Sequence, residues 1–397
     1  MHNGTYEQKL FMTRALGAVL IAQFLSALAD NALLFAAIAL VKNGHHPLEW
    51  VPMLQEFFVV AFVVLAPFVG PFADATPKGR VMLWANALKL LGALGMLSGL
   101  HPLVAYGLVG VGAAAYSPAK YGILSELVDA AHLVKANSLM EGSTIVAILL
   151  GVATGGLLAD QSVDLALWAV AACYLVAMLA NLAIPRVNAV HAGDFHPWRL
   201  LMGFLENTWR LVKDRDVRFS LACTSIFWGS GATLRLLLVA WVPLALHITD
   251  NSTPANLNGA VAIGIAVGAA LAAALIRLES INRVLIPGLM LGPLIMSLVG
   301  VNGLWQAGVL LVAVGLCGGV FVVPLNALLQ ERGHETVGSG YAVAVQNLFE
   351  NLTMLVMIGL YTWSIQIGFD AIQAGFAFGA LILAGLLPVT LARLMGR

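Results

Sequence analysis

Residues 70–80 read Gly70-Pro-Phe-Ala-Asp74-Ala-Thr-Pro-Lys78-Gly-Arg80, a short polar joint between two long apolar stretches. The glycine permits the helix before the joint to approach a neighbouring helix closely. The carboxylate of Asp74 suits a helix end or a basic partner, while Lys78 and Arg80 place two positive charges beside it. The joint therefore predicts two membrane-crossing helices in series, linked on the side of the membrane that retains positive charge.

The composition places the whole chain in a membrane. Its 397 residues are 60% hydrophobic and 10% charged, with a mean hydropathy of +0.91, which leaves too little polar surface for a soluble protein. A net charge of zero argues against a nucleic-acid partner. Cys173, Cys223 and Cys317 lie far apart within apolar stretches, so we expect neither a disulfide framework nor a metal site. The polar start up to Arg14, before a run long enough to span, predicts no cleavable signal.

Apolar blocks of about 20 residues, the length that crosses a hydrocarbon core, follow one another along the chain. Because lipid cannot satisfy free backbone groups, each block is expected to be a helix. The twelve expected spans are 14–41, 50–73, 82–100, 102–126, 136–159, 163–184, 218–246, 255–276, 284–301, 303–330, 340–366 and 371–392. We therefore expect an all-α membrane protein with an N-terminal six-helix bundle (1–185), a linker (186–217) and a C-terminal six-helix bundle (218–397). The polar linker is expected to contain a short interfacial helix around Leu200 to Val212.

Basic residues are distributed unevenly between the two sides of the predicted bundles. With the N-terminus placed inside, the inner segments collect nearly all the Lys and Arg of the loops, and the outer loops keep only Lys42. Asp160, Asp164, Asp250 and Asp370 lie near the outer side. This asymmetry predicts that both ends of the chain lie in the cytoplasm.

The two halves of the chain repeat short patterns. Pro118-Ala-Lys120 near the end of the fourth span corresponds to Pro324-Leu-Asn326 near the end of the tenth. The residues that recur at equal spacing are Asn137, Glu141 and Thr144 in the fifth span and Gln346, Glu350 and Thr353 in the eleventh. Parallel halves related about the membrane normal are typical of one transporter architecture.

Small residues gather at two places in the spans. Gly110-Val-Gly112 lies in the fourth span, and Gly151 with Gly155-Gly156 in the fifth. We interpret both as sites where helices pack closely.

The joint at 70–80 resembles the loop signature of the major facilitator superfamily, GxLAD followed by RxGR(K/R). Pro71 and Pro77 depart from the signature, and its first basic residue is absent. Together with the span number and the repeat, this resemblance implies two pseudo-symmetric six-helix bundles, with helices one, four, seven and ten around a central cavity. It also implies a cytoplasmic gate with two states. The expected gating residues are Asp74, Lys78, Arg80, Glu126 and Arg332.

Charged groups inside the spans point to function, since a charge at the bilayer centre costs about 2.5–3.5 kcal/mol on insertion scales. Lys89 and Glu141 are interpreted as structural ion-pair residues, because a third helix packs peripherally and Glu141 lies close to the cytoplasmic loop. The residues interpreted as a substrate site contributed by both halves are Asp30, Asn31, Lys120, Arg235, Gln346 and Glu350.

The mixed charges of this set leave several ligands open. Arg235 offers a planar fork suited to phosphate, and Lys120 offers a mobile point charge. Asp30 or Glu350 suits an ammonium group. A zwitterionic or anionic phosphate head fits these charges, and so does an amino acid or a proton relay.

Longer stretches resemble one family within that superfamily, the bacterial lysophospholipid transporters. The stretches are Ala22-Gln-Phe-Leu-Ser-Ala-Leu-Ala-Asp30-Asn31-Ala-Leu-Leu-Phe35, Gly110-Val-Gly-Ala-Ala-Ala-Tyr-Ser-Pro-Ala-Lys120-Tyr-Gly122, Phe227-Trp-Gly229 with Leu234-Arg235, Val322-Val-Pro-Leu-Asn326-Ala-Leu-Leu-Gln330-Glu-Arg332 and Ala344-Val-Gln346-Asn-Leu-Phe-Glu350-Asn351. The likeness runs almost end to end and weakens at the termini and in the linker.

The resemblance implies that lysophosphatidylethanolamine and lysophosphatidylglycerol move from the outer to the inner leaflet of the bacterial inner membrane. There an acyltransferase/acyl-ACP synthetase would re-acylate them. The phosphate would meet Arg235 and Lys120, and an ethanolamine amine would meet Asp30 or Glu350. The family fold implies a monomer, and no cofactor is expected.

Three other classes of protein are alternatives to this interpretation. A proton-coupled major facilitator exporter of a drug or small metabolite would share the fold, with Asp30, Glu141 or Glu350 carrying protons. An enzyme is not expected, because a lysolipid acyltransferase uses a His and an Asp separated by four residues, and the chain has no such pair. A P-loop pump is excluded because no GxxxxGK[ST] occurs. Energy must then come from a gradient or from trapping by later chemistry.

Overall fold

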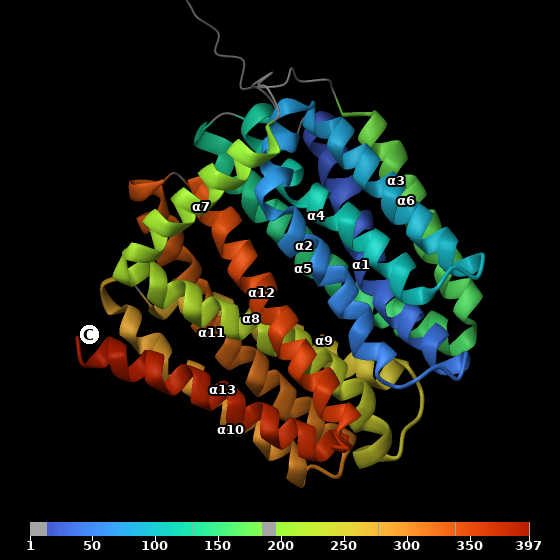
Figure 1. Ribbon diagram of the computed structural model, residues 1–397. Coiled ribbons are helices and arrows are strands. Elements are labelled where there is room, and N and C mark those ends of the chain that lie inside the picture. Colours follow the sequence, from blue (N-terminus) through green and yellow to red (C-terminus); the bar gives the residue numbers. More distant parts are fainter. Residues whose placement is uncertain (1–13, 129, 185–195, 277, 338, 397) are drawn as a thin grey trace, which may run out of the picture.

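The computed structural model describes residues 14–128, 130–184, 196–276, 278–337 and 339–396, and within these ranges the regular structure is helical throughout (Figure 1). The helices of the first half are α1 (Arg14–Asn43), α2 (Trp50–Ala75), α3 (Lys78–Leu97), α4 (Pro102–Leu127), α5 (Ala130–Gln161) and α6 (Val163–Leu182). Those of the second half are α8 (Arg215–Trp241), α9 (Ser252–Leu275), α10 (Leu285–Met296), α11 (Leu304–Thr336), α12 (Ser339–Gln366) and α13 (Ala371–Leu394).

Shorter helical segments connect or extend these helices. The helix α7 (Pro197–Lys213) lies between the halves and confirms that a helix forms around Leu200 to Val212; its place at the membrane interface stays a prediction. A π-helical segment (Val242–Leu246) extends α8. Two 3-10 segments, Leu278–Val284 and Ser297–Gly300, extend α10 at its two ends.

The predicted spans are confirmed to within a few residues at most ends. In the described residues, eleven helical stretches are long and apolar enough to cross a membrane. The twelfth span is α4, which is 26 residues long and packs along α2 and α3. Three ends differ: α3 already begins at Lys78, before the expected 82, α5 begins at Ala130, before the expected 136, and α11 continues to Thr336, beyond the expected 330.

Helix contacts repeat between the two halves. In the first half α1 packs on α5 and α6, α3 on α4 and α6, and α2 on α4. In the second half α8 packs on α12 and α13, α10 on α11 and α13, and α9 on α11. Each contact in one half therefore has its counterpart in the other, which confirms the repeat predicted from short sequence patterns. We call α1–α6 the N bundle and α8–α13 the C bundle.

Glycines permit the close contacts within and between these bundles. A Cβ at Gly112 would lie 2.7 Å from the Ala85 carbonyl oxygen of α3, and one at Gly155 would lie 2.6 Å from the Ala32 Cα of α1. A Cβ at Gly156 would lie 2.8 Å from the Ala255 Cβ of α9, in the other bundle. The interpretation of the small residues as packing sites is confirmed.

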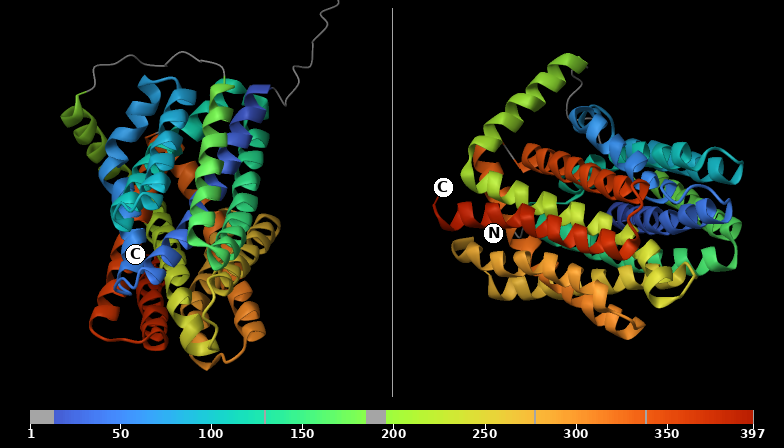
Figure 2. Two further views of the ribbon diagram at one scale, coloured as in Figure 1. Left: turned by 90° about the vertical axis from the view of Figure 1, so that its right-hand side faces the viewer. Right: turned by 60° about the horizontal axis from the view of Figure 1, so that its bottom comes forward.

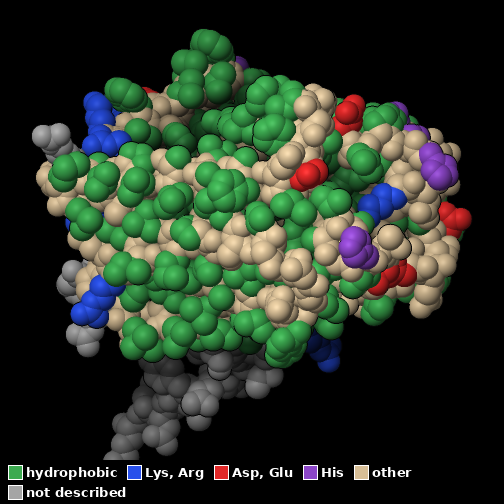
Figure 3. All heavy atoms as spheres, turned by 90° about the horizontal axis from the view of Figure 1, so that it is seen from below, with side chains coloured by type: hydrophobic (Ala, Val, Ile, Leu, Met, Phe, Trp, Pro, Cys, Tyr) green, Lys and Arg blue, Asp and Glu red, His purple; other side chains and the backbone are tan. Residues whose placement is uncertain are grey.

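The two ends of the molecule differ in charge. A broad hydrophobic band lies between an end with Lys and Arg and an end where His, Asp and Glu gather (Figure 3). We call the first the basic end; α1 starts there and α13 finishes there. We call the second the acidic end; Asp160 and Asp370 lie there, beside the ends of α5 and α12. This band, with exposed side chains such as Trp84 (52%) and Ile286 (70%), has the surface that lipid requires.

The two bundles meet at the acidic end and diverge toward the basic end, where α7 crosses between them (Figures 1 and 2). Contacts between the bundles run along two corresponding helix pairs, α5 with α9 and α2 with α12.

Candidate substrate site and gates

A buried ion pair lies in the middle of the N bundle. The Lys89 ammonium of α3 donates to Asp30 Oδ2 of α1 at 2.7 Å and to Ser26 Oγ at 3.0 Å. The Tyr174 hydroxyl of α6 donates to Asp30 Oδ1 at 2.7 Å. The Lys89 side chain is 1% exposed and that of Asp30 is 23% exposed. Three helices thus hold one carboxylate, which keeps a small surface open.

Aromatic rings enclose the ammonium of this pair. The Lys89 nitrogen lies 4.9 Å from the centre of the Tyr116 ring of α4 and 5.8 Å from that of Tyr174. Cation–π attraction and the carboxylate together offset the cost of burying the charge. Lys89 is thus an ion-pair residue, and its partner is Asp30. The side chain of Glu141, the other expected ion-pair residue, lies outside what the structure describes.

The second charged position is Arg235 on α8, in the C bundle. Its Nε is buried and has no hydrogen-bond partner, while the residue as a whole is half-buried. None of the ion pairs found in the described ranges includes Arg235. Tyr106, on α4 of the N bundle, is close enough to be influenced by the charges of both Arg235 and Asp30. Arg235 therefore lies near Tyr106 of the N bundle, and its buried Nε is a donor to spare.

A third polar group occupies the C bundle around Glu350 of α12. Gln346 Nε2 donates to Glu350 Oε1 at 2.7 Å and to Asn326 Oδ1 of α11 at 2.7 Å. The Thr224 hydroxyl of α8 also bonds to Glu350. Glu350 and Gln346 are 6% and 7% exposed. Among the residues that the structure describes, the partners of Glu350 are neutral.

Lys120 does not share the level of Arg235. It lies half-buried on α4, fourteen residues after Tyr106, which corresponds to about 21 Å along the helix axis toward the basic end. Asn31 bonds to its own helix, with Nδ2 donating to the Ala27 carbonyl at 2.8 Å. Asp30 and Arg235 therefore both lie near Tyr106, whereas Lys120 lies apart from it.

Ion pairs at the basic end hold helices within each bundle. Lys78 Nζ at the start of α3 lies 2.5 Å from Glu126 Oε1 near the end of α4. In the C bundle Asp216 of α8 bonds to Arg332 of α11 at 3.1 Å and to Arg393 of α13 at 2.5 Å. Sequence reasoning singled out Arg332 but missed Asp216 and Arg393.

The other two expected gating residues are Arg80 and Asp74. Arg80 is exposed beside the start of α3, and the side chain of Asp74 lies outside the described residues. The pairs at the basic end thus include three of the five predicted gating residues, Lys78, Glu126 and Arg332.

At the acidic end the bundles are bonded to each other. Asp160, on α5 of the N bundle, accepts from Asn251 N at 2.6 Å and from Ser252 N at 2.9 Å. These are free amides at the start of α9 in the C bundle, so the carboxylate caps a helix of the opposite bundle. Thr362 of α12 also donates to Glu56 of α2. Asp160 is the last residue but one of α5, and nothing in the sequence around it indicated this contact.

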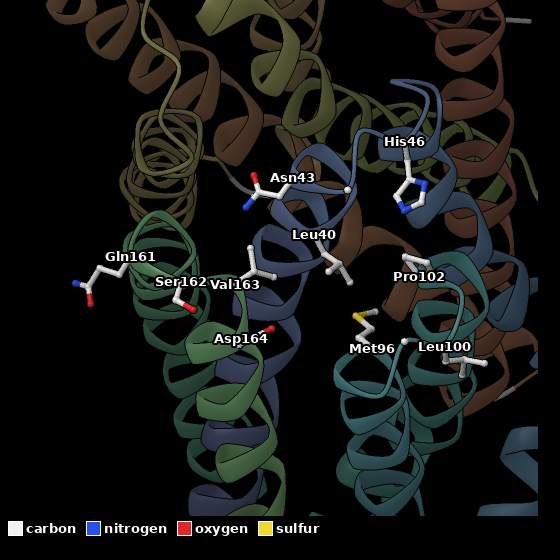
Figure 4. Close-up of a pocket in the computed structure, with 12 residues that line it drawn as sticks. Leu40, Asn43, His46, Met96, Leu100, Pro102, Gln161, Ser162, Val163 and Asp164 are labelled. Atoms are coloured by element: carbon white, nitrogen blue, oxygen red, sulfur yellow. The ribbon is translucent and has the colours of Figure 1, made fainter.

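A hollow of about 550 Å³ opens at the acidic end of the N bundle. Figure 4 shows Leu40 and Asn43 of α1, His46, Met96 and Asp164 around it. None of the predicted substrate-binding residues lines it, so it is separate from the charged positions described above.

The fold and the buried charges define a membrane transporter built from two bundles, and comparison with known proteins agrees. The sequence profile of the Major Facilitator Superfamily matches residues 19–349. The chain is 51% identical over 385 residues to the "Lysophospholipid transporter LplT" of Shigella boydii serotype 4 (strain Sb227), an alignment covering 96% of each protein. It is also 51% identical over 385 residues to the protein of that name in Escherichia coli (strain K12), again with 96% of each covered.

Solved structures share the fold at low identity. A POT family transporter in complex with 5-aminolevulinic acid superposes with a TM-score of 0.77 at 10% identity, over 98% of this chain and 97% of that one. The nucleoside transporter NupG gives 0.73 at 11% identity, over 96% and 98%. The chain belongs to the Major Facilitator Superfamily and, within it, to the family of the two bacterial relatives above.

Proposed function

We propose that this chain transports lysophospholipids and that the Arg235 guanidinium binds their phosphate. The relatives at 51% identity carry the name of lysophospholipid transporters, which supports the substrate class. The observation that carries the site is the position of Arg235: half-buried, near Tyr106 of the other bundle, and without an ion pair in the described chain. A half-buried guanidinium with an unused Nε donor offers a planar, charged fork that suits the oxygens of a phosphate.

The carboxylates of Asp30 and Glu350 have different roles in this proposal. Asp30 is already bonded to Lys89 and Tyr174, so an incoming amine would have to compete with an internal ammonium. Glu350 has only neutral partners among the described residues. It lies beside Thr224, eleven residues before Arg235 on α8 and therefore about 16 Å nearer the basic end, so in this proposal it receives an ethanolamine amine after the head has left Arg235. A glycerol head would use the amide of Gln346 and the hydroxyls nearby. In this proposal, Asp30 and Asn31 shape the N-bundle wall of the site.

Lys120 would act later on the route. It lies toward the basic end from Arg235, so a phosphate released by Arg235 would pass within reach of a second cation. The transfer from one cation to the next keeps the headgroup paired along an apolar path, which avoids the cost of an isolated charge. The single acyl tail stays against apolar helix faces or in lipid.

Alternating access supplies the movement. We propose that the bundles, 1–185 and 218–397, rock as units about the linker 186–217, with the basic end in the cytoplasm of a bacterium and both chain ends there. Lysophosphatidylethanolamine and lysophosphatidylglycerol would move from the outer to the inner leaflet of the inner membrane. An acyltransferase/acyl-ACP synthetase would then re-acylate them, and the transporter itself would act as a monomer. The gating residues would be Asp74, Lys78, Arg80, Glu126 and Arg332.

The test is leaflet-resolved flipping of lysophosphatidylethanolamine in liposomes that contain the protein. Arg235→Ala should weaken the apparent affinity by about tenfold to a hundredfold, because a charge-assisted hydrogen bond contributes about 1.5–3 kcal/mol. Arg235→Lys should keep part of the activity. Arg283→Ala, at an exposed arginine, is the matched control. Full activity in Arg235→Ala, Lys120→Ala and Asp30→Ala would contradict the headgroup site.

The same liposomes separate this proposal from the proton-coupled exporter. Flipping should continue when a protonophore removes the proton gradient. Collapse of transport under that treatment would favour the exporter, which the bacterial relatives do not support.

A further inference from the structure

The helix α7 carries two apolar surfaces, and the protein covers one of them. Phe204 and Leu211 are buried, with 4% and 0% of their surface exposed. They pack in a cluster with Ala342 and Val345 of α12 and with Ala66 of α2. These contacts place α7 across the basic end of both bundles, along the helix pair where the bundles meet. Figure 2 shows α7 standing out from the packed spans as an arm.

The second apolar surface is uncovered in the described structure. Its members and their exposed fractions are Trp198 70%, Met202 40%, Leu205 48% and Trp209 65%. At 100° per residue these four side chains fall within an arc of about 60°. One helix of five turns therefore presents four large apolar side chains, two of them Trp, in a single stripe.

Charged residues border this stripe on the side away from the protein. Arg199, Glu206, Arg210 and Lys213 fall within the adjoining arc of about 60°. Around the helix the order is thus protein contact, uncovered apolar stripe, charged stripe. Each surface suits one kind of surroundings: the contact surface suits the transporter, the apolar stripe suits the acyl region of a membrane, and the charged stripe suits water. The apolar stripe also lies next to the lipid-facing band, because α7 packs against spans.

The charges suit a phospholipid surface. Lys213 lies 5.7 Å from the Trp209 ring, so the ammonium sits directly above the edge of the apolar stripe. Arg210 and Glu206 pair at 2.6 Å on the exposed side, and Arg199 lies one position after Trp198. Trp rings prefer the level of lipid headgroups, with Lys and Arg just above them.

We propose that α7 is a membrane-interface helix that binds the phospholipid leaflet at the basic end and prefers anionic headgroups. The stripe of Trp198, Met202, Leu205 and Trp209 enters the boundary of headgroups and acyl chains. Arg199 and Lys213 meet lipid phosphates. Because the opposite surface of α7 touches both α2 and α12, lipid binding holds the connection between the bundles at the membrane plane while they move.

Spin-label accessibility in the full chain tests the placement. Cys173, Cys223 and Cys317 are replaced by Ala, and single cysteines are introduced by Met202→Cys, Gly203→Cys, Leu205→Cys or Glu206→Cys. The protein is reconstituted in vesicles of phosphatidylethanolamine and phosphatidylglycerol. Positions 202 and 205 should react several-fold more with oxygen than with an aqueous nickel complex, and positions 203 and 206 the reverse. A Cβ at position 203 meets nothing within 4 Å, so a cysteine can replace the glycine there without overlap.

Either of two other patterns would overturn the proposal. Ready access of the nickel complex to positions 202 and 205 would place the stripe in water, as a docking site for a soluble protein. Low access to both reagents at these positions would mean that protein covers the stripe.

The anionic preference has its own test. The label at 205 should lie deeper in vesicles that contain phosphatidylglycerol than in phosphatidylcholine alone, and Arg199→Gln with Lys213→Gln should remove that difference. Equal depth in both lipids before substitution would refute the preference. Arg235→Ala should leave every one of these readings unchanged, which separates leaflet binding from substrate binding. A loss of the pattern in Arg235→Ala would assign it to substrate instead.

Discussion

The buried pair of Asp30 and Lys89 shows how single residues set the character of the N bundle. A lone charge among helices costs several kcal/mol, whereas the pair shares hydrogen bonds with Ser26 and Tyr174 and a ring contact with Tyr116. Its geometry ties α1, α3 and α6 together at one carboxylate. The remaining exposed surface of Asp30 allows the same residue to form part of the site wall.

Removal of one member of this pair should cost more than removal of both. Lys89→Met leaves the Asp30 carboxylate without its cation and should destabilise the protein by about 3–5 kcal/mol, while Lys89→Met with Asp30→Leu should recover part of that loss. Thermal unfolding of the purified protein measures the stability of each variant, and with Asp30→Leu alone these values complete a double-mutant cycle. Lys213→Met, at an exposed position, is the control. A double variant less stable than either single one would show that the pair is not the source of the stability.

At the scale of helices, α9 and α11 depend on interlocked glycines. Gly264 and Gly268 of α9 face the backbone of α11, and Gly315 and Gly319 of α11 face that of α9. A Cβ at any of these positions would overlap a carbonyl oxygen of the partner helix. In a bilayer, where no hydrophobic force drives helices together, such close approach supplies the attraction.

Two glycines of the same helix should therefore respond to alanine in opposite ways. Gly315→Ala forces a methyl group against the Val261 carbonyl and should cost about 1–3 kcal/mol. Gly308→Ala meets nothing within 4 Å and should stabilise α11 by up to about 1 kcal/mol, because alanine loses less backbone freedom than glycine. Midpoints of thermal unfolding decide the sign. Equal shifts at the two positions would refute the interlocking.

At the scale of the whole molecule, the two ends are held by different kinds of contact. Asp160 bonds one bundle to the other at the acidic end. The pairs Lys78–Glu126 and Asp216–Arg332 at the basic end each stay within one bundle. The described state is thus joined at the acidic end, and a transition to the opposite state must first release the cap on α9.

Asp160→Ala should shift this equilibrium. Two hydrogen bonds to a carboxylate at a helix start are lost, and a loss of about 1.4 kcal/mol already reduces the population of the joined state about tenfold relative to the other. Distances between spin labels at the acidic ends of α5 and α9 report the two populations. Asp164→Ala, on the first turn of α6, is the control. An unchanged distance distribution in Asp160→Ala would show that the apolar contacts around Ala255 hold the bundles without the cap.

Apolar blocks and the polar joints between them can be recognised from short stretches of sequence. The sequence by itself therefore determined the twelve spans, and its repeated short motifs determined the two related halves and the family. Lipid leaves the chain no other regular structure, and the cost of a buried charge singles out Asp30, Lys120, Arg235 and Glu350 without coordinates. The short helix near Leu200 could likewise be predicted from the sequence.

Only the tertiary structure decided the partners. Lys89 with Asp30, Asp216 with Arg332 and Arg393, and Asp160 with the start of α9 join helices that lie far apart in the chain. Only the tertiary structure likewise showed that Lys120 and Arg235 lie at different depths. The rotation, tilt and depth of each helix result from packing against several neighbours at once, and a periodic pattern along one helix contains none of that information.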